Sequence, residues 1–442
     1  MRTPDAPHAG PGEAASSRSL AALAAMGFFM ADVRDGLGPF LATHLQSQRT
    51  DQALIGLVMA AGGLAAVAVT PLAGLWVDRT RALRALTAAS TLLILGASAI
   101  AFLTRSPGML VLSQVATGAA GALLAATLAA LTLGLARSAG LRRQTGRNEA
   151  CNHAGNIASA LGAAAVAHWL GAPWMLAVMA GMAAAALACL AAIRAGDIDP
   201  GAARGAQPPG PLAPGAAPGP GGLRALRGHR ALWLFALSCA LFHLGNAAML
   251  PLLNQRLAAT EPASAPLLWT GVAIVVAQLT MVPVALWVAR SRRFDLPVFI
   301  YTAILALPLR GVIAGWIPGA WANVPVQILD GIAAGMLGVA TPLMVERQVR
   351  GSGCYNTALG LVMALQGIGA ALSPAIANAV VGAQGHFGRA FAVLAGCAAL
   401  ALPAFMLAQR SARRAARAAP AQPPHGPLRT RQTAWRPPRR PG

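Results

Sequence analysis

Apolar segments of about 20 residues recur along almost the whole chain, separated by short polar stretches. A helix of this length spans the hydrocarbon core of a bilayer. The segments are much longer than the roughly ten-residue alternating strands of a membrane barrel. The pattern therefore predicts an all-α membrane protein with twelve transmembrane helices, at approximately 20–44, 52–77, 83–104, 107–136, 150–170, 172–193, 231–257, 266–289, 297–317, 320–345, 357–381 and 388–409.

The first apolar segment also has features of a signal peptide, because Arg18 precedes the apolar run from Leu20 to Ala31. Cleavage would leave a mature chain that begins among charged residues just after Met30. Eleven further spans follow, which is typical of a multi-pass protein that keeps its first helix. We therefore expect 20–44 to be a retained span.

Composition and charge give the orientation. Charged residues make up 11% of the chain, mean hydropathy is +0.58, and all 34 cationic residues are arginines. With the N-terminus inside, 28 arginines are cytoplasmic and four lie on the opposite side. This positive-inside pattern predicts two cytoplasmic termini, in the inner membrane of a bacterium. For the Arg/Pro-rich tail 410–442 we favour contact with membrane lipids, or disorder, over nucleic-acid binding.

The spans fall into two sets of six. A Gly/Pro-rich segment at 194–230 has little to bury, so we expect a disordered cytoplasmic linker there and a disordered N-tail at 1–19. The halves, 20–193 and 231–409, resemble each other faintly: Pro39 and Pro251, and likewise Pro71 and Pro283, lie 212 residues apart. A duplicated six-helix unit is one known transporter construction, with substrate bound between the halves.

The segment "GLWVDRTRALR" resembles the loop 2–3 signature of the major facilitator superfamily. Gly74, Asp78 and Arg79 match it, whereas Arg81 replaces the second glycine of the signature. The resemblance implies two pseudo-symmetric six-helix halves, a small-molecule substrate and no cofactor, and we expect a monomer. It also implies a gating loop that locks the cytoplasmic ends together in one access state. The alternative is a plain positive-inside loop.

Three charges interrupt the first span: Asp32, Arg34 and Asp35. Each charge at a bilayer centre costs about 2.5–3.5 kcal/mol on insertion scales. Pro39 removes the hydrogen bond to the carbonyl of Asp35 and weakens the helix at these charges. We therefore expect the charges to face a polar cavity or the neighbouring half.

The family resemblance implies that spans 1, 4, 7 and 10 line a central cavity. It would place Asp330 there, with His243 and Asn246 on one wall. We propose Asp32 or Asp35 as the proton-coupling site, modulated by Arg34; structural ion pairs are the alternative. Asp330 is either a second titrating group or the partner of Arg310.

Further polar residues gather near the cytoplasmic side. Asn152 and Asn156 share one face of span 5, with His153 beside them. We expect these side chains to have hydrogen-bond partners on other helices of the bundle. Charged residues close to the predicted membrane edge form a possible cytoplasmic latch: Arg147, Glu149, Glu346 and Arg347.

We favour a proton-coupled secondary transporter that works by alternating access, with export placed ahead of uptake. A proton-coupled uptake symporter and a facilitator are the alternatives, and a transport-like sensor or scaffold is also open. A membrane enzyme acting on a lipid would need a nucleophile or metal motif, and none is present; there is also no phosphate-binding loop and no metal-ligand spacing. The substrate stays open: an anion could use Arg34 or Arg310, and a cation the acidic residues.

Overall fold

The computed structural model describes residues 15–33, 41, 44–45, 48–170, 174–206, 226–261, 266–382 and 384–418. Arg34 and Asp35 lie outside the described residues, as do most of the linker and most of the C-terminal tail. The described part is helical and contains no strand. Its elements are α1 (Ser17–Ala31), α3 (Gln52–Arg79), α4 (Leu83–Leu103), α5 (Pro107–Trp169), α6 (Trp174–Ala192), η2 (Ala195–Asp197), α7 (Pro200–Ala203), α9 (Arg230–Asn246), α10 (Met249–Thr260), α11 (Pro266–Arg290), α12 (Leu296–Trp316), η4 (Ala320–Ala322), α13 (Asn323–Val349), α14 (Tyr355–Val381), α15 (Phe387–Ala399) and α16 (Ala401–Ala418).

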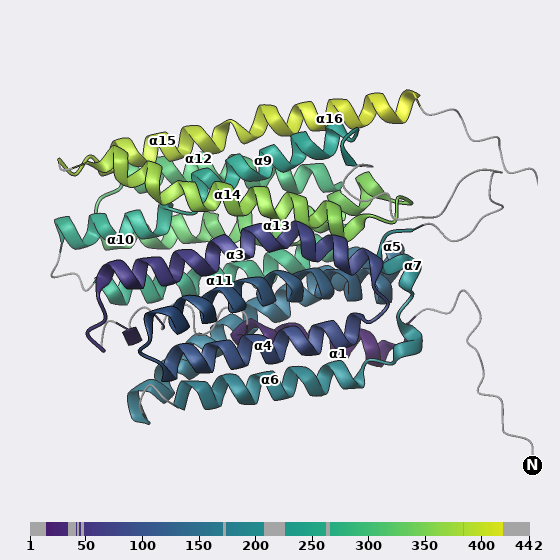
Figure 1. Cartoon of the computed structure of the whole chain (residues 1–442). Coiled ribbons are helices and arrows are strands. Elements are labelled where there is room, and N and C mark those ends of the chain that lie inside the picture. The colour runs from purple at the N-terminus through teal and green to yellow at the C-terminus, as the bar shows by residue number, and fades with distance from the viewer. Residues whose placement is uncertain are drawn as a thin grey trace, which may run out of the picture.

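The long helices run along one another and form a single bundle (Figure 1). Ten helices of the described chain are long and apolar enough to cross a membrane, which confirms the all-α membrane fold. The 63-residue α5 counts once, although Arg137 interrupts it with a left-handed backbone (φ 52°) between the segments predicted as spans 4 and 5. The count of twelve stays a prediction.

Two separate apolar cores underlie the bundle. Helices α1, α3, α4, α5 and α6 bury one core, and α9 to α16 bury the other, to which Leu133 and Leu141 of α5 also belong. Leu64, Leu72 and Trp76 on α3 are exposed, as expected for side chains that face lipid tails. Each half therefore packs largely around its own core, and the contacts between halves are a distinct set.

The start of the linker differs from the expected disorder. Residues 195–206 contain η2 and α7, and their backbone bonds both halves. The amide of Asp199 donates to the carbonyl of Gly134 on α5 (3.1 Å), and the amide of Tyr355 on α14 donates to the carbonyl of Arg204 (3.1 Å). A disordered linker would leave these amides and carbonyls bonded to water. In the structure they are paired with backbone groups of the two halves instead.

Two further boundaries differ. Helix α1 begins at Ser17, inside the predicted N-tail, because Ser16 caps it by accepting from the amide of Ser19. Helix α16 continues to Ala418, so the predicted C-terminal tail begins within a helix. In Figure 1 the start of α1 and the end of α16 lie at the same end of the bundle. We call this the arginine-rich end, because the loops with most arginines lie there.

Candidate functional site

A cavity of about 480 Å³ lies between the halves, lined by side chains of α1, α5, α9, α11, α13 and α14. Most of its wall is apolar, as is usual for small-molecule sites, with a limited set of polar groups. Both halves contribute to that set, which consists of Thr132, Thr145, Asn148, Glu149, Asn152, His153, Asn156, His243, Asn246, Gln278, Thr341, Tyr355 and Gln366.

The α5 side of the cavity carries the polar face expected from the sequence. Asn152, His153 and Asn156 all line it. Asn148 and Glu149 line it too, although we expected Glu149 in a latch at the membrane edge. The helix does not begin at residue 150 but runs continuously through this region, so residues one turn before Asn152 point the same way. Glu149 is therefore a cavity residue.

His153 connects the two halves across the cavity. Its Nδ1 lies 2.8 Å from Oε1 of Gln278 on α11. Its Nε2 lies 3.8 Å from Oε2 of Glu149, a separation suited to an ion pair when the imidazole is protonated. With the amide oriented in this way, Nδ1 carries the hydrogen that Gln278 accepts. A carboxylate, an imidazole and an amide thus form one chain from α5 to α11.

On the opposite wall, His243 and Asn246 of α9 line the cavity. Behind them the buried Arg310 donates a hydrogen bond to Oδ1 of Asn246, and its Nη1 lies 2.9 Å from Oδ1 of Asp330. Arg310 is 1% exposed, and neither it nor Asp330 is a lining residue. Asp330 is therefore the partner of Arg310, which is one of the two roles that we expected for it. The Arg310–Asp330 pair therefore lies behind the cavity wall, and neither charge lines the lumen.

Asp32 lies outside the cavity, contrary to expectation. It is 3% exposed at the end of α1, and its Oδ1 accepts a hydrogen bond from the Ser159 hydroxyl of the same half. The α1 residues that line the cavity are Leu23, Gly27 and Met30. Asp32 comes two residues after Met30, about 200° around the helix, and so points away from the lumen. Arg34 and Asp35 lie outside the described residues.

The loop 2–3 signature meets the other half at the arginine-rich end. The Asp78 carboxylate at the end of α3 accepts four hydrogen bonds from the start of α14: the Asn356 amide (3.1 Å) and side chain (2.8 Å), and the Thr357 amide (2.7 Å) and hydroxyl (2.6 Å). A carboxylate is stabilised at a helix N-terminus by these free N–H groups. A Cβ on Gly74 would overlap the carbonyl of Asn356, so glycine permits this approach. Arg79 and Arg81 are exposed.

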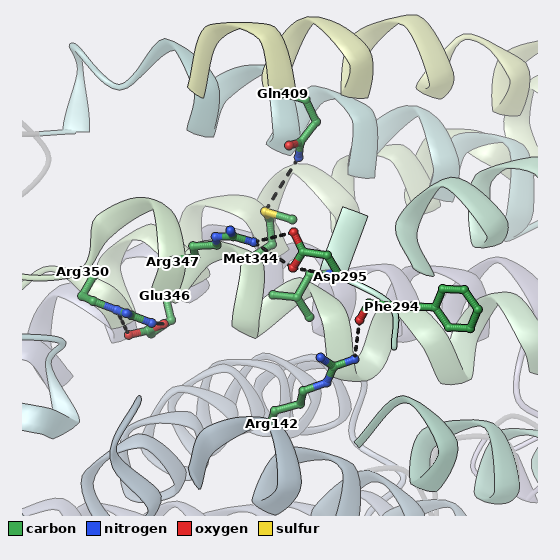
Figure 2. Close-up of polar contacts among 9 residues, drawn as sticks. Arg142, Phe294, Asp295, Met344, Glu346, Arg347, Arg350 and Gln409 are labelled. Atoms are coloured by element: carbon green, nitrogen blue, oxygen red, sulfur yellow. Dashed lines mark hydrogen bonds and ion pairs between the residues drawn. The ribbon is translucent and has the colours of Figure 1, made fainter. Parts of the chain in front are cut away.

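Helices α5 and α11 form a second contact between the halves. Arg142 of α5 donates to the carbonyls of Val288 (2.8 Å) and Phe294 (3.3 Å), the latter bond visible in Figure 2. Gly146 faces Ala289, and a Cβ there would overlap that side chain. Neither Arg142 nor Gly146 is among the site residues predicted from the sequence. Arg142 lies in the arginine-rich segment of α5 that the sequence predicts as a loop between spans 4 and 5, where composition does not distinguish one arginine from another.

The four predicted latch residues do not act together. Glu346 accepts from Ser138 of α5 (2.6 Å), which joins the halves, and also from Arg350 (2.8 Å) on its own helix. Arg347 pairs with Asp295 (3.0 Å) within the C-terminal half, as Figure 2 shows. Arg147 is half-buried on α5. Glu346 therefore has a contact between the halves, as a latch requires.

Sequence similarity identifies relatives of this chain. A family profile described as Major Facilitator Superfamily matches residues 20–358. Uncharacterized MFS-type transporters of two Mycobacterium tuberculosis strains are each 39% identical over 376 residues, which cover 84% of this chain and 88% of the relative.

Solved structures share the fold at low sequence identity. The human organic anion transporter MFSD10 has a TM-score of 0.67 at 16% identity, covering 89% of this chain and 99% of its own. The E. coli fucose:proton symporter FucP also reaches 0.67, at 13% identity, covering 89% of this chain and 98% of its own. A bacterial homologue of the iron transporter ferroportin, solved in an outward-facing state, reaches 0.63 at 13% identity, covering 89% and 99%.

Proposed function

Because the chain belongs to the major facilitator superfamily, whose members are membrane transporters and not enzymes, we propose that the central cavity is its substrate site and that transport is coupled to protons. The observation that carries the proposal is the cavity itself, whose polar groups come from both halves. A site shared by two halves changes its accessible side when the halves rock about it.

The proposed closed end is the arginine-rich one. Asp78 joins α3 to α14, and Arg142 joins α5 to α11, on the two sides of the bundle where the halves meet. Opening this end requires both sets of hydrogen bonds to break. The arginine distribution and the bacterial relatives support assigning it to the cytoplasm, with the protein in an inner membrane.

Glu149 and His153 are our proposed proton-binding groups, in place of Asp32. Both face the cavity, and His153 also holds Gln278 of the other half. A proton shared by the pair favours the observed arrangement, because an unprotonated Nε2 and an ionised carboxylate repel each other. Losing that proton would weaken the connection through His153 and so link proton release to the separation of α5 from α11. To Asp32 we assign the role of holding α1 against α5 through Ser159.

The chemistry of the cavity favours a neutral or cationic polar substrate. Among its described lining residues are amides, hydroxyls, two imidazoles and the Glu149 carboxylate, but no arginine. Asp330 and Asn246 already engage Arg310, which is thereby withheld from an anion. Asn and Gln side chains offer donors and acceptors together, which suits a molecule with several hydroxyl, amide or amine groups.

The test is flux in proteoliposomes. A panel of neutral and cationic solutes is applied with an inward and then an outward pH gradient, to wild type and to Glu149→Gln and His153→Gln. We expect gradient-driven flux to fall at least tenfold in both variants, because each variant removes one of the two groups that share the proton. The direction of flux tests export, which we propose, against uptake by symport.

His386→Gln is the matched control, since His386 lies in the loop before α15, beside Gln384 and away from the cavity. We expect it to transport like wild type. Gradient-driven flux that survives in both cavity variants would contradict the proton assignment. Flux of the same size without a gradient would identify a facilitator.

A further inference from the structure

A second cavity, of about 300 Å³, opens at the arginine-rich end and is distinct from the central one. It lies where the loop between α3 and α4 meets the ordered start of the linker. Three arginines line it: Arg81 and Arg84 from the loop side, and Arg204 from the linker. The Asp78 carboxylate, the acidic group of its lining, already accepts four hydrogen bonds from Asn356 and Thr357.

Arg84 lines this cavity and is only partly engaged, since its Nη2 lies 3.5 Å from the carbonyl oxygen of Ala191. Nε of Arg84 is buried and has no hydrogen-bond partner among the described residues. The first residues of α4, from Leu83 to Ala85, also line the cavity. Ala82, at the N-cap of α4, provides no side-chain cap, so the amides of this first turn have no acceptor from a capping side chain. Guanidinium groups and the N-terminus of a helix are both donors suited to phosphate oxygens.

We propose that this cavity is a binding site for a phosphate-type anion, which holds the arginine-rich end closed. The anion would be shared by Arg81 and Arg84 on one side and Arg204 on the other. The carbonyl of Arg204 accepts from the amide of Tyr355 at the start of α14, directly beside the hydrogen bonds of Asp78. An anion here therefore connects the loop 2–3 segment, the linker and the C-terminal half. Free phosphate and the headgroup of an anionic lipid share this chemistry.

The test uses the full-length protein in nanodiscs. One arm titrates inorganic phosphate by calorimetry into protein in phosphatidylcholine discs. The other arm compares melting temperature in phosphatidylcholine discs with that in discs containing phosphatidylglycerol, both without free phosphate. The variants are Arg84→Gln and Arg204→Gln. The control is Arg292→Gln, which removes the same charge from the exposed segment between α11 and α12, away from the cavity.

We expect phosphate affinity to fall about tenfold or more in both variants and to stay unchanged in the control, as the loss of one charge-assisted hydrogen bond predicts. If phosphate does not bind, but phosphatidylglycerol raises the melting temperature of wild type and not of the variants, the site takes a lipid headgroup. Absence of both effects, or equal losses in Arg204→Gln and Arg292→Gln, overturns the proposal. Arg204 lies on the linker, outside the transmembrane helices, so its variant does not depend on helix packing.

Discussion

At the scale of single residues, three described ionic groups within the predicted spans, Asp32, Arg310 and Asp330, have partners inside the protein. Asp32 binds Ser159, and Arg310 binds Asp330 and Asn246. A charge in a low-dielectric interior is tolerated when it is paired and hydrogen-bonded. The contacts of Asp32, Arg310 and Asp330 suit a structural role, whereas the described lining of the cavity consists of amides, hydroxyls, two imidazoles and one carboxylate among its polar groups.

The Arg310–Asp330 pair gives a prediction for stability. Asp330→Asn leaves a fully buried guanidinium without its counter-charge, which costs about 3–5 kcal/mol for buried pairs. We expect a clear fall in the melting temperature of the purified protein. The double variant Arg310→Met, Asp330→Leu removes both charges and should regain part of the loss.

Asp295→Asn is the matched control for that variant. It breaks the ion pair between Asp295 and Arg347, whose side chains are 64% and 54% exposed. Exposed pairs contribute at most about 1 kcal/mol, so the melting temperature should change little. Equal falls in melting temperature for Asp330→Asn and Asp295→Asn would mean that burial does not determine how much the Arg310–Asp330 pair contributes to stability.

At the scale of elements, the ordered start of the linker explains how the ends of the helices are held. Asp197 of η2 accepts from the hydroxyls of Ser16 (2.5 Å) and Ser19 (2.6 Å) at the start of α1. Asp199 caps α7 by accepting from the amides of Gly201 and Ala202 (both 2.9 Å). The segment therefore ties α1, α5 and α14 together at one end of the bundle.

The contact of Asp197 predicts a dependence of stability on pH. The hydrogen bonds from Ser16 and then Ser19 lower the pKa of the Asp197 carboxyl below its usual value. A lowered pKa stabilises the folded state above the unfolded pKa of about 3.9, and the stabilisation is lost as pH falls through the folded pKa. Asp197 is only partly buried and lies near the surface, so the effect should stay below about 1 kcal/mol.

Melting temperatures of wild type and Asp197→Asn between pH 7 and pH 3 measure this effect. Wild type should be the more stable near pH 7, and the difference should shrink as pH falls below 4. Ser19→Ala should show a smaller difference of the same sign. A gap between wild type and Asp197→Asn that stays constant across this range would contradict the assignment.

At the scale of the whole molecule, two separately packed halves meet at the arginine-rich end through α3 with α14 and α5 with α11. On the first side, Gly74 lies against the carbonyl of Asn356, where a Cβ would overlap that oxygen. The buried thiol of Cys354 precedes α14 and is 0% exposed. Cys354 directly precedes Tyr355 and Asn356, which bond the linker and Asp78, so we expect its reactivity to rise when these contacts open.

We expect Gly74→Ala to separate α3 from α14 and to increase labelling of Cys354 by a thiol reagent several-fold. Peptide-resolved mass spectrometry distinguishes Cys354 from the other four cysteines. Gly63→Ala on the same helix is the control, because a Cβ there meets nothing within 4 Å. Unchanged labelling of Cys354 in Gly74→Ala would show that this contact does not close the arginine-rich end.

The sequence by itself determined the membrane class, the all-α fold and the family, because spans of about 20 apolar residues and the Gly74–Asp78 signature are local patterns. It also located the polar face of span 5, since residues three and four apart on one helix necessarily share a side. The tertiary structure decided what those groups face. The rotation of α1 turns Asp32 away from the lumen, and the continuity of α5 brings Glu149 into it. Rotation and continuity depend on packing between distant segments, which a local pattern does not encode.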